Sequence, residues 1–382
     1  MITLGIESSC DETSVAILKY PNRVLANITL SSLKEHKRYG GVVPEIASRA
    51  HVETILPCLD LALKRARLPG GQARVALNDV DLIAVTEGPG LMGSLLVGIS
   101  AAKALSWALR KPLVGVNHVI AHIYAGFLPG VGARQGRAGT SPPRFPVLGL
   151  VVSGGHTMLI RMDSARRIKI LGNTRDDAAG EAFDKVAKMM YLGYPGGPEI
   201  DRLAKGQDPN RIFFTRPFLE KNSLDFSFSG IKTAVFYKIK EMVGARSLPG
   251  RQAGSRPGWE NPAPTPIQKR LIAAGFQEAV CDVLVEKALR AARKEKLRTV
   301  IVGGGVSANS RLREKLRSAG KKEGLKMMFP GLVFCQDNAA MIAGLGAALY
   351  KEGRRDGLDL SGYSDFHPMT RENLNGNKIR RI

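Results

Sequence analysis

The stretches LGIESSCDETSVAIL at 4–18 and LGLVVSGGHTMLI at 148–160 decide the fold that this sequence predicts. Each passes from an apolar segment through small polar residues into a second apolar segment, which predicts a strand, a turn and a strand. The two stretches form a weak internal repeat. Gly and Ser in such turns expose backbone N–H groups to an anion. Either turn alone is more often an ordinary hairpin, but two equivalent turns that face one cleft favour a ligand site.

Further apolar runs alternate with longer helical patterns along the chain, which is typical of an α/β fold with a mixed sheet. These runs lie at 82–86, 112–117, 145–153 and 299–305. Pro44 opens one predicted helix. At 382 residues the chain is long enough for two packed lobes. We expect lobes at 1–128 and 145–350, and Gly, Pro and Arg mark a connector at 129–144, an inserted loop at 244–266 and an extension at 351–382.

The chain carries 56 Lys and Arg against 34 Asp and Glu, a formal net charge of +22. This charge favours a polyanionic partner such as nucleic acid, and the alternative is a solvated basic surface. Aromatic residues make up only 6% and do not alternate with the basic clusters, so phosphate contact is favoured over base stacking. The clusters are KEHKR at 34–38, RAARKEKLR at 290–298 and the terminal KIRRI. The Gly-, Pro- and Arg-rich loops at 129–144 and 244–266 are further candidates for contact with an RNA backbone, and plain linkers are the more usual alternative.

The four cysteines are far apart and form no C-x-x-C pair, which favours a reducing compartment. The N-terminus enters an apolar strand and then acidic residues, unlike a signal or transit peptide. The apolar stretch that begins at 339 is shorter than the roughly 20 residues of a membrane span. We therefore expect a soluble cytoplasmic protein.

His118 and His122 follow a predicted strand, and their spacing places both imidazoles on one face of a helix, as metal ligands require. The alternative is a packed histidine beside one that caps a carbonyl. Val119 stands where a metalloprotease helix carries its glutamate, so a peptidase would lack its general base. Asp337 is the best candidate for a third ligand, at a strand-to-helix junction where it would also cap the helix. Such a set suits iron(II) or zinc.

Two further segments indicate a nucleotide site. VIVGGGVSANSRLREKL at 300–316 predicts a strand, a glycine turn and a helix, although a packing turn is the alternative. The segments 176–190 and 194–201 place Asp184 and Asp201 on helices that flank a Gly-Gly turn. Such carboxylates accept hydrogen bonds from ribose hydroxyls, and exposed helix carboxylates are the alternative.

Ten segments in order resemble the TsaD family of threonylcarbamoyladenosine synthases, from Met1 to about Phe366. They are GIESSCDETS, HKRYGGVVPEIASRAHVE, TEGPGLMGSLLVG, NHVIAHIYAGF, LVVSGGHT, DDAAGEAFDK, YPGGPEIDRLA, DFSFSGIKTAV, VGGGVSANSRLR and FCQDNAAMIA. The second segment is similar to the bacterial and organellar branch. The resemblance implies a two-lobed actin/hexokinase-like ATPase (ASKHA) fold with duplicated ribonuclease-H-like mixed sheets flanked by helices.

The resemblance also implies an acyltransferase. It would move a threonylcarbamoyl group from threonylcarbamoyl-AMP to the exocyclic amine of the adenosine 3′ of the anticodon, in tRNAs that read codons beginning with A. One divalent metal, iron(II) in preference to zinc, would bind His118, His122 and Asp337. Partners would be TsaB, a smaller paralogue, and TsaE, an ATPase. Implied substrate contacts are Val152, Ser153, Gly154, Gly155, His156, Asp184, Gly197, Asp201 and Asn309, and candidates for steering the amine are Asp11 and Glu12 in the first turn.

Three other functions stay open. A small-molecule kinase of the same superfamily would share both hairpins and the glycine turn, but needs no histidine pair. A scaffold that only holds tRNA would keep the basic surface and tolerate the loss of His118. A metallopeptidase is the third alternative.

Overall fold

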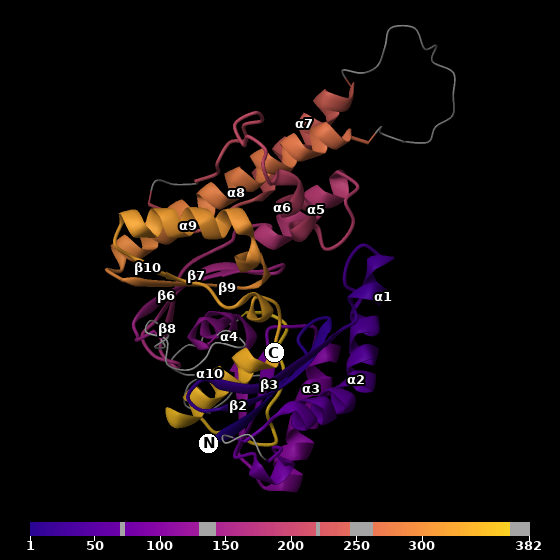
Figure 1. The fold of residues 1–382 in the computed structure, drawn as a ribbon, viewed down its shortest axis with the longest axis vertical. Coiled ribbons are helices and arrows are strands. Elements are labelled where there is room, and N and C mark those ends of the chain that lie inside the picture. Colours follow the sequence, from indigo (N-terminus) through magenta and orange to yellow (C-terminus); the bar gives the residue numbers. More distant parts are fainter. Residues whose placement is uncertain (69–72, 130–142, 219–221, 245–262, 367–382) are drawn as a thin grey trace, which may run out of the picture.

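The computed structural model describes residues 1–68, 73–129, 143–218, 222–244 and 263–366. These residues form two lobes stacked along the long axis of the molecule (Figure 1). The predicted connector at 129–144 and loop at 244–266 fall almost entirely outside the described residues, as does the end of the 351–382 extension. The division of the chain at these boundaries therefore stays a prediction.

The first sheet has the strand order β3-β2-β1-β4-β5. The first three strands form an antiparallel meander, and β4 and β5 then run parallel to β1. Its strands are β1 (Ile2–Glu7), β2 (Glu12–Lys19), β3 (Arg23–Ser31), β4 (Leu82–Gly88) and β5 (Leu113–Asn117). The central strands are buried on both faces, because helices cover both sides of a mixed sheet of this kind.

The second sheet repeats this topology in the order β10-β9-β6-β7-β8. A meander of three strands is again followed by two strands parallel to the first of them. Its strands are β6 (Val147–Val152), β7 (Thr157–Met162), β8 (Ile168–Asn173), β9 (Thr299–Gly303) and β10 (Lys326–Met328). The β1-β2 and β6-β7 hairpins occupy equivalent places, so the predicted repeat and the predicted duplicated mixed sheets are confirmed.

Two helices of the first lobe cover the outer face of the first sheet and pack against a cluster that includes Leu4, Ile55 and Leu95. They are α2 (Pro44–Arg65) and α3 (Met92–Leu109), and the short α1 (Leu33–Lys37) and η1 (Leu77–Asp79) lie in the connections between elements of this lobe. Helix α2 begins at Pro44, as predicted. Helix α3 alone among the described residues has the length and composition to span a membrane, yet Leu95 and Ile99 bury its inner side over the sheet.

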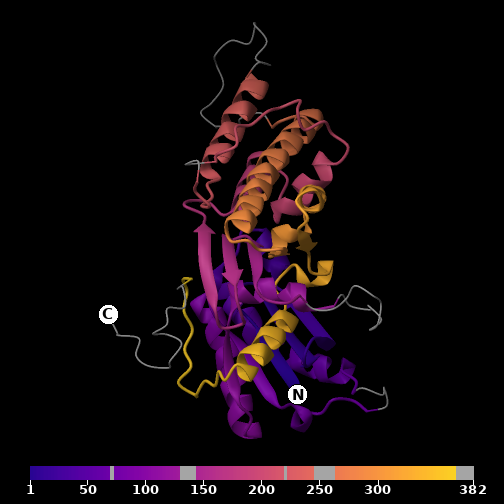
Figure 2. The same cartoon turned by 90° about the vertical axis from the view of Figure 1, so that its left-hand side faces the viewer.

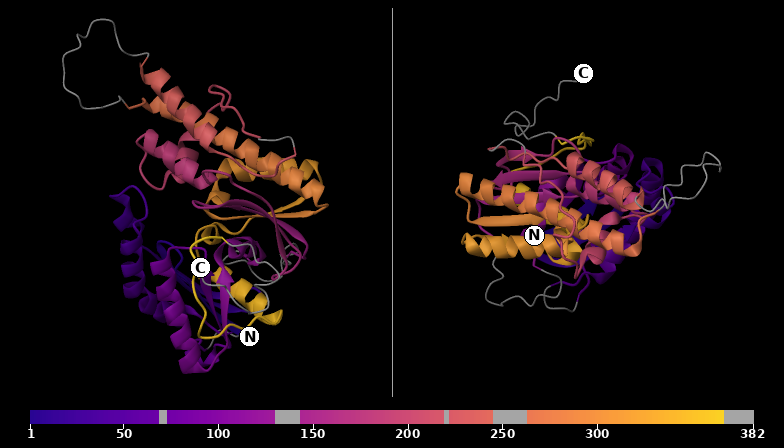
Figure 3. Two further views of the ribbon diagram at one scale, coloured as in Figure 1. Left: turned by 180° about the vertical axis from the view of Figure 1, so that it is seen from behind. Right: turned by 90° about the horizontal axis from the view of Figure 1, so that it is seen from above.

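Helices of the second lobe cover the outer face of the second sheet around Leu150, Phe183 and Phe276. They are α5 (Ala179–Met189), α6 (Gly196–Ala204), α7 (Ser229–Gly244), α8 (Pro266–Lys294) and α9 (Ser310–Lys322), with η3 (Gly305–Ala308). Helices α8 and α9 lie side by side on this face, as the view from above in Figure 3 shows.

The layer between the two sheets holds α4 (His118–Tyr124) with η2 (Ala125–Phe127), and α10 (Ala339–Lys351), which follows η4 (Leu332–Phe334). Helix α4 comes after the first sheet in the chain but packs on β6 and β9 of the second sheet. Helix α10 comes after the second sheet in the chain but packs on β1, β2 and β4 of the first sheet. The chain beyond α10 then runs alongside the first sheet, where Asp356 bridges to Leu113 (Figure 2). This crossing brings the segment before α10 to the N-terminal end of α4.

Candidate metal and substrate site

The histidine helix α4 starts directly at the end of β5. Asn117 caps it, because its side-chain oxygen accepts a hydrogen bond from Ile120 N (3.0 Å). The cap fixes the first turn, from which His118 and His122 project on the same face with ring centroids 4.6 Å apart. Both imidazoles are buried. The predicted helix and the shared face are confirmed.

Asp337 completes the group, from the segment just before α10. Its Oδ1 lies 3.1 Å from His122 Nε2 and 3.4 Å from His118 Nε2. The ligand atoms of the three residues lie within 4.8 Å of one another. The predicted capping role of Asp337 is wrong: Asn338, one residue later, caps the helix by accepting from Met341 N. The predicted direct strand-to-helix junction is also wrong, because η4 separates β10 from α10.

Side chains of the first sheet hold the start of α10. Ser14 Oγ accepts a hydrogen bond from Ala339 N (2.9 Å), and Asn27 Oδ1 accepts one from Ala340 N (3.0 Å). With the cap by Asn338, the first three amides of the helix are satisfied. Because these bonds fix the N-terminal end of α10 to β2 and β3, they also fix the position of Asp337, which lies directly before that end.

The charges of the group are strongly coupled. Burial opposes ionisation of His118, but the carboxylates of Asp337 and Glu7 raise its pKa to about 9. Burial also opposes ionisation of Asp337, but His118 and His122 hold its pKa well below the usual carboxyl range. Both ring nitrogens of His122 are buried, and within the described residues the contact of Nε2 with Asp337 is the one polar contact of the ring. Two imidazoles and one ionised carboxylate fit a divalent metal and leave coordination positions for a substrate oxygen.

The turn of the first hairpin carries Asp11 and Glu12. Ser32 donates from its backbone N (3.0 Å) and its hydroxyl (2.9 Å) to the carbonyl oxygen of Asp11. Burial and the negative charge of Asp337 raise the pKa of both carboxyls, and that of Glu12 rises well above its ordinary value. The two residues therefore lie within the electrostatic reach of Asp337.

The turn of the second hairpin follows Val152. Ser153 N donates to His156 O (2.8 Å), and His156 N donates to Ser153 Oγ (3.1 Å), which closes the turn. The positions that a side chain would fill at Gly154 and Gly155 meet no atom within 4 Å, so the turn is open on that side. Burial, then the charges of the two metal-site histidines, lower the pKa of His156 to about 4. The two lobes thus bring both predicted turns to the histidine pair.

The predicted nucleotide contacts lie at the starts of α6 and α9. Asp184 accepts from Gly196 N (2.7 Å), at the turn that holds Gly197. Asp201 accepts from Ser310 Oγ (2.8 Å). Both carboxylates thus brace a turn at which a helix begins, a structural role that the sequence did not predict.

Asn309 caps α9, accepting from Leu312 N (2.9 Å) while it donates to Gln277 Oε1 (2.7 Å). In the preceding glycine turn, Gly304 has a φ of 87° and lies against the carbonyl of Val152, where a side chain would clash.

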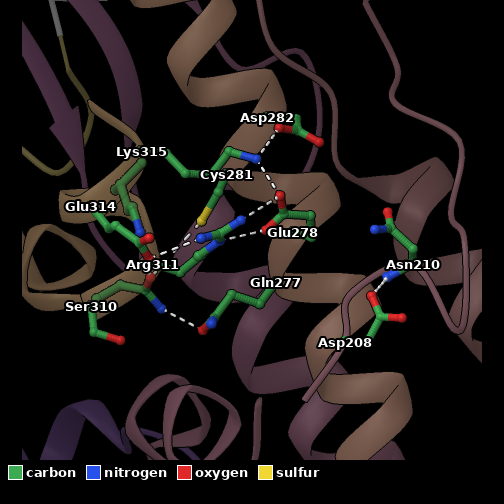
Figure 4. Close-up of polar contacts among 12 residues, drawn as sticks. Asp208, Asn210, Gln277, Glu278, Cys281, Asp282, Ser310, Arg311, Glu314 and Lys315 are labelled. Atoms are coloured by element: carbon green, nitrogen blue, oxygen red, sulfur yellow. Dashed lines mark hydrogen bonds and ion pairs between the residues drawn. The ribbon is translucent and has the colours of Figure 1, made fainter. Parts of the chain in front are cut away.

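An ionic network ties α8 to α9 behind this turn (Figure 4). Arg311 donates two hydrogen bonds to Glu278 (2.7 and 3.0 Å), and Lys315 contacts both Glu278 and Asp282. Burial opposes ionisation, but Arg311 and Lys315 lower the pKa of Glu278 to about 2. Sequence reasoning missed this network, although charges at i and i+4 on both helices were a visible signal.

Sequence reasoning also missed two buried glutamates beside the site. Glu7 contacts His118 Nδ1 (2.9 Å). Glu87 forms a two-point ion pair with Arg354 (3.1 and 2.8 Å). Glu7 lies in the predicted first hairpin, so its sequence position was a visible signal. No local sequence pattern links Glu87 to Arg354 in the C-terminal extension.

A family model for tRNA N6-adenosine threonylcarbamoyltransferase, TsaD, matches residues 23–344. A protein of that name from Moorella thermoacetica is 49% identical over 358 residues, which cover 94% of each chain. One from Dictyoglomus turgidum is 46% identical over 96% of this chain and 98% of its own. Among solved structures, full-length HypF matches 95% of this chain and 47% of its own with a TM-score of 0.57 at 13% identity, which shows the shared fold alone. The chain is a transferase that belongs to the TsaD family.

Proposed function

We propose that the chain transfers a threonylcarbamoyl group from threonylcarbamoyl-AMP to the exocyclic amine of the adenosine 3′ of the anticodon, in tRNAs that read codons beginning with A. The observation that carries the proposal is the group of buried His118 and His122 with half-buried Asp337 where the two hairpin turns meet, in a chain of this family. Neither a tRNA scaffold nor a small-molecule kinase needs such a group.

The three residues would hold one divalent metal ion, for which the family resemblance favours iron(II) over zinc. When bound, the ion supplies a Lewis acid that polarises the acyl donor and orients it. The support is the donor set: two imidazole nitrogens that face one carboxylate oxygen, with His122 lacking any other partner among the described residues.

The turn at Val152–His156 would bind the phosphate of the adenylate through its backbone, because Gly154 and Gly155 leave its surface open. Asp184, Gly197, Asp201 and Asn309 would line the nucleoside side. A carboxylate has about four acceptor positions, so Asp184 and Asp201 keep capacity for ribose hydroxyls besides the bonds that brace the helix starts.

In the transfer, the adenosine nitrogen forms a bond to the carbamoyl carbon, the bond from that carbon to the phosphate oxygen breaks, and AMP leaves. The nitrogen also loses a proton. Asp11 and Glu12 would steer the amine, and the one of the two that is ionised would accept this proton, because a raised pKa makes an ionised carboxylate a stronger base than an exposed one.

Two protein partners are part of the proposal, a TsaB-like paralogue and a TsaE-like ATPase. Six large apolar side chains are exposed on the neighbouring helices α2 and α3, which supports a protein partner on these helices. They are Val52, Leu56, Leu61, Met92, Leu96 and Trp107. The tRNA substrate and the reducing cytoplasm are consistent with the basic surface and the four free cysteines.

The test is nucleoside analysis of tRNA after incubation with threonylcarbamoyl-AMP and both partners. Wild-type protein should form threonylcarbamoyladenosine, and the His118→Ala/His122→Ala variant should form at least a hundredfold less. A double variant that modifies tRNA at the wild-type rate would contradict the proposal. A parallel incubation contains ATP and candidate small-molecule acceptors and is analysed for phosphorylated product. Formation of such a product would instead support the kinase alternative.

A further inference from the structure

Glu7 is the last residue of β1, and none of its surface is exposed. Alternate residues of a strand share a face, so Glu7 points to the same side as Gly5, which lies against Ala339 and Ala343 of α10. Its carboxylate therefore enters the layer between the two sheets. An ionised carboxylate in such a place is costly unless hydrogen bonds compensate it.

Three donors surround this carboxylate. Ser9 N donates to Oε1 (2.6 Å), and Thr86 Oγ1 donates to Oε2 (2.7 Å). The third donor is His118 Nδ1, 2.9 Å from Oε2. The donors come from the turn that follows β1, from the end of β4 and from the start of α4, which meet at the site.

The contact decides which nitrogen of His118 faces the metal. A carboxylate accepts only from a protonated nitrogen, so Nδ1 carries a hydrogen and Nε2, on the side of Asp337, is left with a free lone pair once the ring is neutral. No such partner among the described residues contacts Nδ1 of His122. The two histidines are therefore held differently: the Nδ1 side of His118 contacts the buried carboxylate of Glu7 and the hydroxyl of Ser9 (3.2 Å), whereas the Nδ1 side of His122 is held by packing alone.

We propose that Glu7 is a positioning residue, which fixes the tautomer and the ring orientation of His118 and so presents Nε2 to the metal. This proposal rests on the proposed metal site. Residue 7 lies outside the matched range of 23–344, and the assignment comes from the hydrogen bonds alone. Because a carboxylate behind a ligating histidine also makes that histidine a better donor, its loss should weaken metal binding about 10–100-fold.

The test compares wild-type protein with Glu7→Gln. Glutamine has nearly the same shape but offers one acceptor oxygen, so an N–H₂ group must face at least one of the three former donors. We measure the affinity of the full chain for Co²⁺ by competition with a chelator, together with the visible absorption of bound Co²⁺, which reports coordination geometry. The proposal predicts at least a tenfold loss of affinity and a changed spectrum.

Two control variants separate positioning from folding. Glu87→Gln changes another buried glutamate that contacts neither histidine, so it should lower stability without a change in Co²⁺ affinity. Thr86→Val removes one donor to Glu7 and leaves the histidine contact in place, so its loss of affinity should be smaller than that of Glu7→Gln. If Glu7→Gln does not fold, Glu7→Asp retains the charge with a shorter reach and should still bind Co²⁺ more weakly than wild type.

Wild-type affinity and an unchanged spectrum in the folded Glu7→Gln variant would overturn the role of Glu7 while leaving the metal site intact. Equal losses in Glu7→Gln and Glu87→Gln would assign the effect to stability and would also overturn it. A wild-type chain that binds no metal would instead refute the proposed site and, with it, this inference.

Discussion

The ion pair between Glu87 and Arg354 makes a quantitative prediction about the extension that follows α10. Arg354 donates two hydrogen bonds to Glu87 and two to Asp356 (2.9 and 3.3 Å). The side chain of Glu87 is 9% exposed and that of Arg354 19%. Arg354→Ala would leave the buried carboxylate of Glu87 without its cation.

Removal of one partner from a buried pair costs about 3–5 kcal/mol. Because Arg354 keeps some contact with water, we expect the lower end, about 3 kcal/mol, from a total stability on the order of 5–15 kcal/mol. Arg355→Ala is the matched control, since Arg355 is exposed and donates to the backbone carbonyl oxygens of Tyr350 and Arg354 (both 2.9 Å). That variant should lose less than about 1 kcal/mol.

The loss should also depend on pH. Burial raises the pKa of Glu87 even though Arg354 opposes the shift, and loss of the arginine raises it further. An acid with a raised folded-state pKa is destabilising once it ionises, so the effect grows as pH rises above the ordinary carboxyl value of 4.5. The destabilisation should therefore be larger near about pH 8 than near about pH 5.

The assay is urea unfolding of wild type, both single variants and Glu87→Gln/Arg354→Met, with the denaturant slope checked for constancy. The double variant has an uncharged side chain at both positions of the pair and should recover at least half of the loss. A loss below about 1 kcal/mol in Arg354→Ala, or one that grows as pH falls, would refute the reasoning.

Three further predictions concern the second lobe and the RNA. The pKa of Glu278 is about 2 in the folded chain and 4.5 in the unfolded chain, so its ionised form stabilises the fold at pH values above 4.5. The free energy of unfolding should therefore fall as pH drops from 4.5 towards 2, and Glu278→Gln should reduce this fall in urea unfolding measured across that pH range. Gly303→Ala should lower Co²⁺ affinity at least tenfold, because the added carbon would overlap the carbonyl oxygen of His122 and displace that histidine; wild-type affinity would contradict this. The logarithm of tRNA affinity should fall linearly with that of salt concentration, with a slope of about 0.7–0.9 per phosphate contacted, and a flat response would exclude phosphate contact as the main source of binding.

The parts of the fold that could be predicted from sequence are those with a local signal. Both hairpins, the helix at Pro44 and the histidine helix follow from periodicity, glycine turns and a spacing of four. The set of His118, His122 and Asp337 was also a correct prediction of which side chains meet. The hairpins and the two helices depend on residues close together in the chain, whereas Asp337 joins the histidine pair from a distant segment and was found by its residue type and the family resemblance.

The parts that could not be predicted depend on contacts between distant residues. The bond from Ala339 N to Ser14 Oγ joins positions 325 residues apart, and it helps to fix α10 to the first sheet. The pair of Glu87 and Arg354 spans 267 residues. No periodicity marks either partner, because each depends on where the other segment packs. The error about the cap has the same origin: Asp337 and Asn338 are equally good capping residues, and only the path of the chain decides between them.

The central claim is that His118, His122 and Asp337 form one metal site, and elemental analysis of purified protein tests it most directly. The account predicts one divalent ion per chain in wild type and almost none in His118→Ala/His122→Ala, with both proteins folded by circular dichroism. Full occupancy in the double variant would contradict it.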